Sequence, residues 1–207
     1  MNKILKKLEQ FGIVPVVVLE DDKDAALLAK ALCDGGLACA EVTFRTAAAE
    51  ESIRIMSEKF PEMVVGAGTV LTVEQVDRAV KAGAQFIVSP GFNPVVVKYC
   101  IDHEIPITPG VVTPSEMEQA IAMGLEVVKF FPAEPSGGLD MIKAVAAPYT
   151  TLRFMPTGGI NPENIVPYLQ YDKILACGGS WMVKGKLIAE GRFDEIEKLT
   201  REAAEIV

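Results

Sequence analysis

Histidine is almost absent from this chain of 207 residues, because His103 is the only one. A single histidine excludes metal sites built from several histidines, and His103, in a polar stretch after a predicted helix, is interpreted as a solvated loop residue rather than as part of a Ser-His-Asp triad. Paired cysteines are also missing: Cys33, Cys39, Cys100 and Cys177 form no C-x-x-C motif and no metal-ligand spacing. This pattern is typical of a protein in a reducing cytoplasm.

Long apolar runs are missing as well. No stretch approaches the length of a membrane span, and the basic start MNKILKKL is followed by no apolar core, so we expect no signal peptide. The net charge of −8 argues against nucleic acid or an anionic membrane as a partner. Half of the residues are hydrophobic and 23% are charged, which predicts a folded cytoplasmic protein with a sizeable core.

Short apolar runs and helical patterns alternate along the whole chain. We predict strands at residues 13–19, 38–45, 64–69, 86–89, 105–108, around Lys129, 152–155 and 173–177. We predict helices at residues 2–11, 25–35, 47–59, 72–83, from 93, 113–124, after 138, from 161 and 193–206. Eight strand–helix units without a linker predict a single domain, residues 1–207, folded as an α/β (β/α)8 TIM barrel with an extra N-terminal helix. A doubly wound open sheet has the same alternation, but the count of eight favours the barrel.

Lys129 lies inside the apolar run LEVVKFFPAE, at residues 125–134. Such a run predicts a buried strand of a parallel sheet. A buried ammonium is costly unless it is paired or loses its proton, and a neutral lysine is a nucleophile suited to forming Schiff bases with ketones. Phe131 points to the same side and would help to keep the amine dry. The alternative is a structural lysine that reaches water at the strand end.

Polar residues gather at the ends of the second and third predicted strands, where a barrel carries its active site. Glu41 and Arg45 alternate with Val42 and Phe44, so the acid and the guanidinium share one face. Thr69 offers a hydroxyl after the small residues GAG at 66–68. These small residues predict room for a ligand, although glycines also ease packing at the corners of a barrel. The polar face predicts a substrate site beside Lys129, although an internal ion pair would give the same pattern.

Two glycine pairs follow the last two predicted strands, as TGG at 157–159 and GGS at 178–180. Loops at these places commonly bind phosphate through backbone N–H groups. We therefore predict that Gly158, Gly159, Gly179 and Ser180 hold a phosphate, the alternative being simple tight turns. The acids EDD at 20–22 are interpreted as charges at a helix N-terminus rather than as a metal site.

Six motifs together resemble those of the bifunctional 2-keto-3-deoxy-6-phosphogluconate (KDPG) / 4-hydroxy-2-oxoglutarate (KHG) aldolases. They are EVTFRT at 41–46, GAGTVL at 66–71, SPG at 89–91, KFFPAE at 129–134, PTGGI at 156–160 and GGSW at 178–181. The similarity runs from the first to the last predicted strand and covers nearly the whole chain. It implies a class I lyase of the Entner–Doudoroff pathway that needs no metal or other cofactor.

The resemblance also implies a role for each residue of the site. Lys129 would form the Schiff base with the C2 ketone of a 2-keto acid, and Glu41 would be the acid/base. Arg45 and Thr69 would hold the pyruvyl carboxylate. The pyruvyl pocket would have Pro90 and Phe131 as its walls, and Thr157 would contact the hydroxyls of the substrate. The distal phosphate would be held by Gly158, Gly159, Gly179 and Ser180. Members of the family that resemble this chain are homotrimers.

Two other functions remain open from the residues alone. A phosphosugar isomerase, epimerase or decarboxylase could use the same phosphate loops without imine chemistry. A phospho-ligand binding protein could use them without catalysis, although Glu41, Arg45 and Lys129 together argue against it. Reduction by borohydride in the presence of pyruvate would distinguish the aldolase from both.

Overall fold

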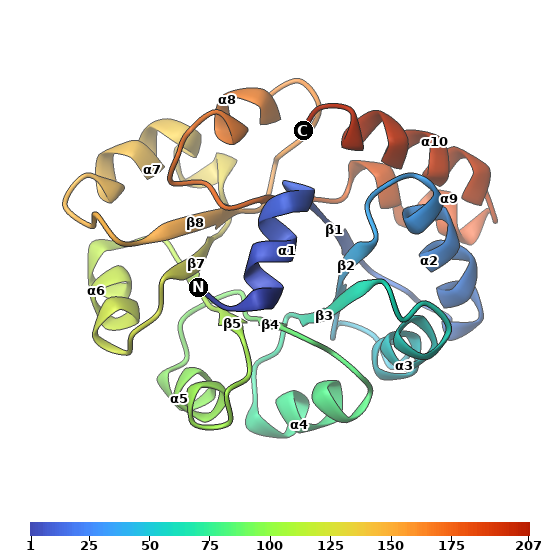
Figure 1. Ribbon diagram of the computed structural model, residues 1–207, viewed down its shortest axis with the longest axis horizontal. Helices are drawn as coiled ribbons and strands as arrows, with labels where there is room; N and C mark the ends of the chain where they lie inside the picture. The colour runs from blue at the N-terminus through green and yellow to red at the C-terminus, as the bar shows by residue number, and fades with distance from the viewer.

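Parallel strands form the centre of the computed structural model, which describes all 207 residues. The strands are β1 (Ile13–Val17), β2 (Cys39–Thr43), β3 (Val64–Gly68), β4 (Ile87–Val88), β5 (Ile107–Thr108), β6 (Gly110–Val111), β7 (Val127–Phe130), β8 (Arg153–Pro156) and β9 (Cys177–Gly179). One curled sheet has the order β5-β4-β3-β2-β1-β9, and a second has the order β6-β7-β8. Figure 1 shows the strands around a common centre with helices outside them.

Helix α1 precedes the first strand, and the later helices follow the strands along the chain and form the outer layer. They are α1 (Lys3–Phe11), α2 (Ala25–Asp34), α3 (Ala49–Lys59), α4 (Val73–Lys81), α5 (Pro94–Asp102), α6 (Pro114–Ala122), α7 (Gly138–Ala146), α8 (Ile165–Leu169), α9 (Gly185–Ala189) and α10 (Phe193–Ala204). Three short 3-10 helices are η1 (Asp22–Asp24), η2 (Glu134–Ser136) and η3 (Trp181–Val183). This α/β architecture with parallel strands agrees with the alternation in the sequence.

The predicted start signals cap their helices. The Thr72 side chain accepts a hydrogen bond from the backbone of Gln75 at the start of α4. The Glu116 carboxylate accepts one from the backbone N–H of Thr113 at the start of α6, at 2.8 Å. Both contacts satisfy backbone N–H groups that a helix leaves unpaired in its first turn.

Several element boundaries differ from the prediction by a few residues. The strand expected at 105–108 is reduced to β5 at Ile107–Thr108, and a further short strand, β6, follows Pro109, which has no N–H to give to a ladder. The last strand, expected at 173–177, is β9 at Cys177–Gly179, and Ile174 makes only an isolated bridge to Phe154. The helix expected from residue 161 begins four residues later, because Asn161 first forms a turn in which it accepts from the backbone of Glu163.

Two apolar clusters hold the layers together. The larger, of 48 buried residues, lies between the strands and the surrounding helices. The smaller, of 11 residues, combines strand side chains with Leu5 and Leu8 of α1. In Figure 1 this helix lies across the middle of the ring of strands. A salt bridge of 2.7 Å between Arg153 and Glu9 joins β8 to the same helix. Helix α1 therefore covers one end of the central core and leaves the opposite end of the strands for other contacts.

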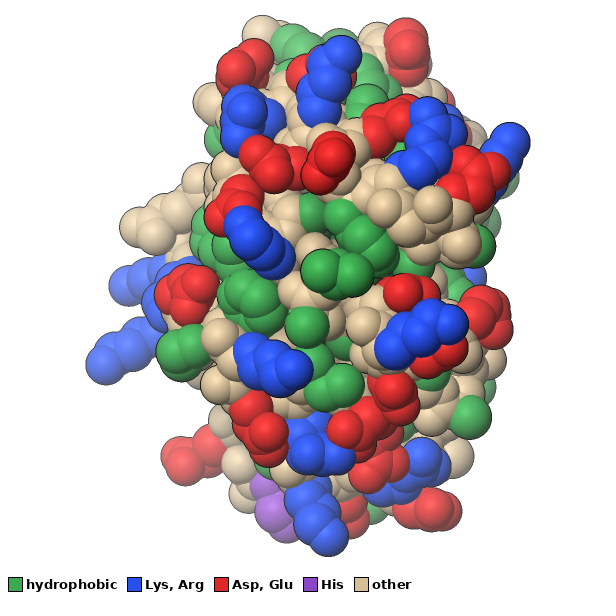
Figure 2. Space-filling model, turned by 90° about the vertical axis from the view of Figure 1, so that its right-hand side faces the viewer, with side chains coloured by type: hydrophobic (Ala, Val, Ile, Leu, Met, Phe, Trp, Pro, Cys, Tyr) green, Lys and Arg blue, Asp and Glu red, His purple; other side chains and the backbone are tan.

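Charged side chains of both signs are spread over the face formed by α2, α3, α9 and α10, around a group of apolar side chains (Figure 2). Many are paired along their own helix, as Lys30 is with Asp34 and Arg201 is with Glu197. Exposed pairs of this kind contribute little to stability, so the apolar clusters carry the fold. No helix has both the length and the apolar character needed to cross a membrane.

Candidate active site

Lys129 and Glu41 form a buried ion pair at the centre of the molecule. Lys129 Nζ donates to Glu41 Oε1 at 3.0 Å and is 3.4 Å from Oε2. The two residues come from β7 and β2, and they are 6% and 2% exposed. Breaking a buried pair leaves an uncompensated charge, so each group fixes the other. Chemically, the pair places a primary amine beside a carboxylate that can exchange protons with it.

A glycine makes room for Glu41. A Cβ added to Gly68 of β3 would lie 2.2 Å from Glu41 Oε1 and 2.6 Å from its Cγ. The small residues at 66–68 predicted room for a ligand, but the space beside Gly68 is filled by the carboxylate of Glu41. Thr43 shares the face of Glu41, but its hydroxyl donates to the backbone carbonyl of Val17 at 3.0 Å. That hydroxyl therefore connects β2 to β1 and is not free to bind a ligand.

Arg45 and Thr69 lie together, as predicted from the ends of β2 and β3. Arg45 Nε donates to Thr69 Oγ1 at 3.3 Å, and the arginine side chain is exposed. Thr69 has a φ of 56°, in the left-handed region that a β-branched residue rarely adopts. Strain of this kind persists where the surrounding structure enforces it, often at functional sites. The free N–H groups of Arg45 are available to a carboxylate.

The ring of Phe131 flanks the amine. Lys129 Nζ is 5.3 Å from the ring centroid, within the range of a cation–π contact. Pro90 approaches from the neighbouring chain segment, since a Cβ on Gly110 would lie 2.0 Å from the Pro90 carbonyl oxygen. Gly110 is the register partner of Lys129 in the second sheet. Pro90 is thus held one strand away from the lysine.

A cavity of about 190 Å³ joins the guanidinium to both glycine loops. Its lining includes seven of the predicted site residues: Arg45, Phe131, Thr157, Gly158, Gly159, Gly179 and Ser180. It also includes four that were not predicted to contact a ligand: Val16, Val18, Ile160 and Gly178. Alternation along the first strand could have indicated the two valines. No comparable local pattern pointed to Ile160.

The glycine loops have a geometry that other residues would disturb. Gly158 and Gly159 have φ values of 101° and 84°, which side chains rarely allow. A Cβ on Gly178 would lie 2.3 Å from Thr157 Oγ1, and one on Gly179 would lie 1.9 Å from the ring of Trp181. All four glycines line the cavity, and side chains at these positions would either strain the backbone or clash with Thr157 and Trp181.

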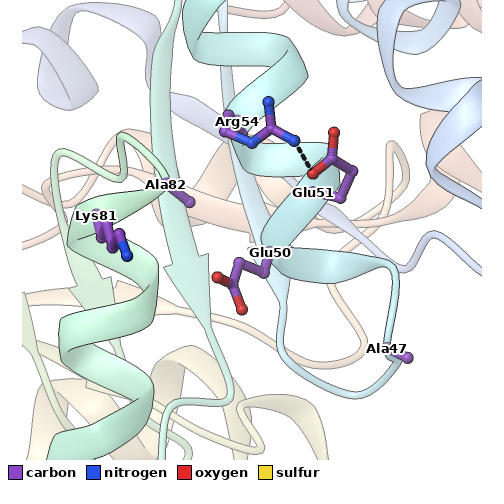
Figure 3. Close-up of a pocket in the computed structure, with 6 residues that line it drawn as sticks. All are labelled: Ala47, Glu50, Glu51, Arg54, Lys81 and Ala82. Carbon is purple, nitrogen blue, oxygen red and sulfur yellow. Dashed lines mark hydrogen bonds and ion pairs between the residues drawn. The ribbon is translucent and has the colours of Figure 1, made fainter.

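A larger hollow lies elsewhere, between α3 and α4 (Figure 3). It has about 330 Å³ and is lined by Ala47, Glu50, Glu51, Arg54, Lys81 and Ala82. Arg54 is paired with Glu51, and Glu50 is paired with Arg78 at 2.7 Å. None of the predicted site residues lies there, and its main charges are already matched. At the end of β1, Asp21 caps η1 by accepting from the backbone of Lys23, as its helix N-terminal position predicted.

Comparison with known proteins matches this chain to one family. The model of the family "KDPG and KHG aldolase" matches residues 4–199. The 2-dehydro-3-deoxy-phosphogluconate aldolase of Treponema pallidum is 50% identical over 100% of this chain and 99% of its own length.

Two solved structures of KDPG aldolases share the fold. The enzyme of Legionella pneumophila, with pyruvate captured at low pH as a covalent carbinolamine intermediate, has a TM-score of 0.94 at 36% identity and covers 98% of both chains. The enzyme of Zymomonas mobilis with 3-phosphoglycerate has a TM-score of 0.91 at 39% identity, over 98% of this chain and 96% of that one.

Proposed function

The chain belongs to the KDPG and KHG aldolase family, and from this premise we propose that it is a class I aldolase that cleaves KDPG to pyruvate and glyceraldehyde 3-phosphate. It would also cleave the unphosphorylated KHG to pyruvate and glyoxylate. The observation that carries the proposal is the buried Lys129–Glu41 pair, with Nζ and Oε1 3.0 Å apart. A lysine and an acid in one dry site are the two groups that Schiff-base cleavage needs.

Lys129 is the nucleophile and Glu41 carries the protons. Glu41 takes a proton from the ammonium, so Nζ can attack the C2 ketone. The protonated Glu41 then gives that proton to the carbinolamine hydroxyl, and water leaves as the iminium forms. The carboxylate next removes the proton of the C4 hydroxyl. The C3–C4 bond breaks, its electron pair moves toward the iminium nitrogen, and the aldehyde leaves. Protonation of C3 and hydrolysis release pyruvate and free Lys129.

The two ends of the substrate are held by different parts of the site. Arg45 and Thr69 bind the pyruvyl carboxylate, because the guanidinium can donate two parallel hydrogen bonds to it. Pro90 and Phe131 form the walls of the pyruvyl pocket. At the other end Thr157 contacts substrate hydroxyls, and the phosphate is bound by Gly158, Gly159, Gly179 and Ser180. The cavity lined by Arg45 and the glycines supports one substrate that reaches from the guanidinium to the phosphate end.

We extend the proposal to the closure of the fold and to its assembly. Pro109 alone separates β5 from β6, and bridges of Phe154 with Ile174 and Thr157 with Gly178 connect β8 to the segment of β9. These links support one closed eight-stranded barrel in which α1 is an additional N-terminal helix. Exposed apolar side chains such as Val95, 68% exposed, support association into the homotrimer implied by the family. We propose that the enzyme acts in the cytoplasm, in the Entner–Doudoroff pathway.

The test is a product assay on the purified protein. Pyruvate released from KDPG is followed with lactate dehydrogenase and NADH, and the same assay is run with KHG. Release of pyruvate from KDPG that disappears in Lys129→Ala, with the variant still folded, supports the proposal. Full activity in Lys129→Ala would refute the Schiff-base role of this lysine.

A further inference from the structure

Glu134 and Tyr168 form a contact for which the proposed reaction has no use. The Tyr168 hydroxyl donates a hydrogen bond to Glu134 Oε1. Glu134 begins η2, directly after the strand of Lys129, and Tyr168 lies in α8, after the first glycine loop. The tyrosine is 2% exposed, and neither residue lines the substrate cavity. A buried phenol that bonds a carboxylate this close to the site calls for a structural or functional reason.

Glu134 contacts the Gly158–Gly159 loop without lining the cavity. Its backbone N–H donates to the carbonyl of Gly158 at 3.0 Å. A Cβ on Gly159 would lie 2.6 Å from the Cβ of Glu134 and 2.7 Å from its Cγ. The loop backbone therefore rests directly on the Glu134 side chain. Any movement of that side chain changes where the loop N–H groups point.

The tyrosine holds this supporting side chain in one place. A Cβ on Gly138, at the start of α7, would lie 2.9 Å from Glu134 Oε1 and 3.1 Å from the Tyr168 hydroxyl. The pair is thus enclosed by backbone as well as by its own hydrogen bond. Burial, followed by the hydrogen bond and the negative charge of Glu134, raises the pKa of Tyr168 far above its usual value. The phenol keeps its proton at every pH at which the enzyme would be assayed.

We propose that Glu134 and Tyr168 are positioning residues that hold the Gly158–Gly159 loop in its phosphate-binding geometry. The inference rests on the proposed function, because it takes this loop as the phosphate site of the aldolase. Backbone donors bind an anion well only when the supporting groups fix them in advance. The pair acts on the phosphate end alone, since its contacts run to the loop and not to Lys129. It therefore determines how well the enzyme favours phosphorylated substrates.

Tyr168→Phe removes the hydrogen bond while it keeps the ring. We expect the KM for KDPG to rise by roughly 5- to 20-fold, less than the full effect of losing a hydrogen bond to a charged group because the bond acts on the phosphate only through the loop, with kcat changed less than about 3-fold. Inhibition by inorganic phosphate should weaken by a similar factor. The pyruvate concentration that gives half-maximal inactivation by borohydride should stay the same. Glu134→Gln keeps an acceptor oxygen and should raise the KM for KDPG by a smaller factor, about 2- to 5-fold.

Tyr99→Phe is the matched control. The Tyr99 hydroxyl also donates to a carboxylate, that of Asp77 at 2.6 Å, but it joins α5 to α4 far from the glycine loops. This variant should keep the wild-type KM for KDPG. The thermal midpoints of all variants are measured, and Glu134→Gln supplies the answer if Tyr168→Phe does not fold.

Two results would overturn the inference: an unchanged KM for KDPG in folded Tyr168→Phe, or equal losses with KDPG and with pyruvate. Failure of the proposed function looks different. In that case the wild-type protein itself releases no pyruvate from KDPG and is not inactivated by borohydride with pyruvate.

Discussion

Gly68→Ala offers a sharp test of the site because it changes neither the acid nor the nucleophile. The new Cβ would lie 2.2 Å from Glu41 Oε1, whereas ordinary contact begins at 3.4 Å. The carboxylate must therefore move by about 1.2 Å, away from the position in which it accepts from Lys129 at 3.0 Å. A displacement of about 1 Å at a reacting group can cost about 100-fold in rate. We expect kcat on KDPG to fall by about that factor.

The assay is steady-state pyruvate release, accompanied by a thermal melt. Overpacking should also lower the free energy of unfolding by about 1–3 kcal/mol. Gly185→Ala is the control, because a Cβ there meets nothing within 4 Å, and it should behave as wild type. If Gly68→Ala keeps the wild-type kcat while it remains folded, the carboxylate position does not limit the reaction. The acid/base role given to Glu41 would then be wrong.

Three further predictions address the core, the thiols and the phosphate end. Leu8→Ala should lower the free energy of unfolding by about 2–5 kcal/mol in urea titrations, because the side chain is fully buried in the smaller apolar cluster. A loss below about 1 kcal/mol would contradict that packing. Burial, with smaller effects of Glu62 and Asp34, raises the pKa of Cys33 to about 11, so its thiolate is scarce at pH 8. Alkylation of Cys33 by iodoacetamide should therefore be ~200-fold slower in the native than in the unfolded protein and should accelerate as the pH rises toward 11; equal rates would refute it. Ser180→Ala should raise the KM for KDPG by roughly 3- to 10-fold and leave KHG nearly unaffected, whereas equal losses on both would remove Ser180 from the phosphate site.

Features of the fold and the site that depend on local sequence patterns could be predicted from the sequence. The apolar strand around Lys129 and the alternation of Glu41 and Arg45 with apolar neighbours depend only on period, so burial and facing could be predicted from them. The glycine pair at 158–159 follows β8 as predicted, whereas Gly178 and Gly179 lie within β9 rather than after the last strand. Helix caps such as Thr72 were also local signals.

Features that could not be predicted from the sequence depend on contacts between segments that are far apart in the chain. The polar face of the second strand placed Glu41 beside Lys129, but the bond between them spans 88 positions, and no local pattern shows that the two groups pair directly. For the same reason the reading of Gly68 missed its contact with Glu41. The hydrogen bond from Tyr168 to Glu134 spans 34 positions, and it was not foreseen although Glu134 belonged to a recognised motif.

The central claim is that Lys129 forms a Schiff base with the 2-keto acid, and borohydride reduction in excess pyruvate tests it most directly. The protein is digested after reduction, and the peptides are mapped by mass. A reduced pyruvyl adduct on the peptide that contains Lys129, absent from Lys129→Ala, is the predicted result. An adduct on another lysine, or no adduct on folded protein, would contradict the claim.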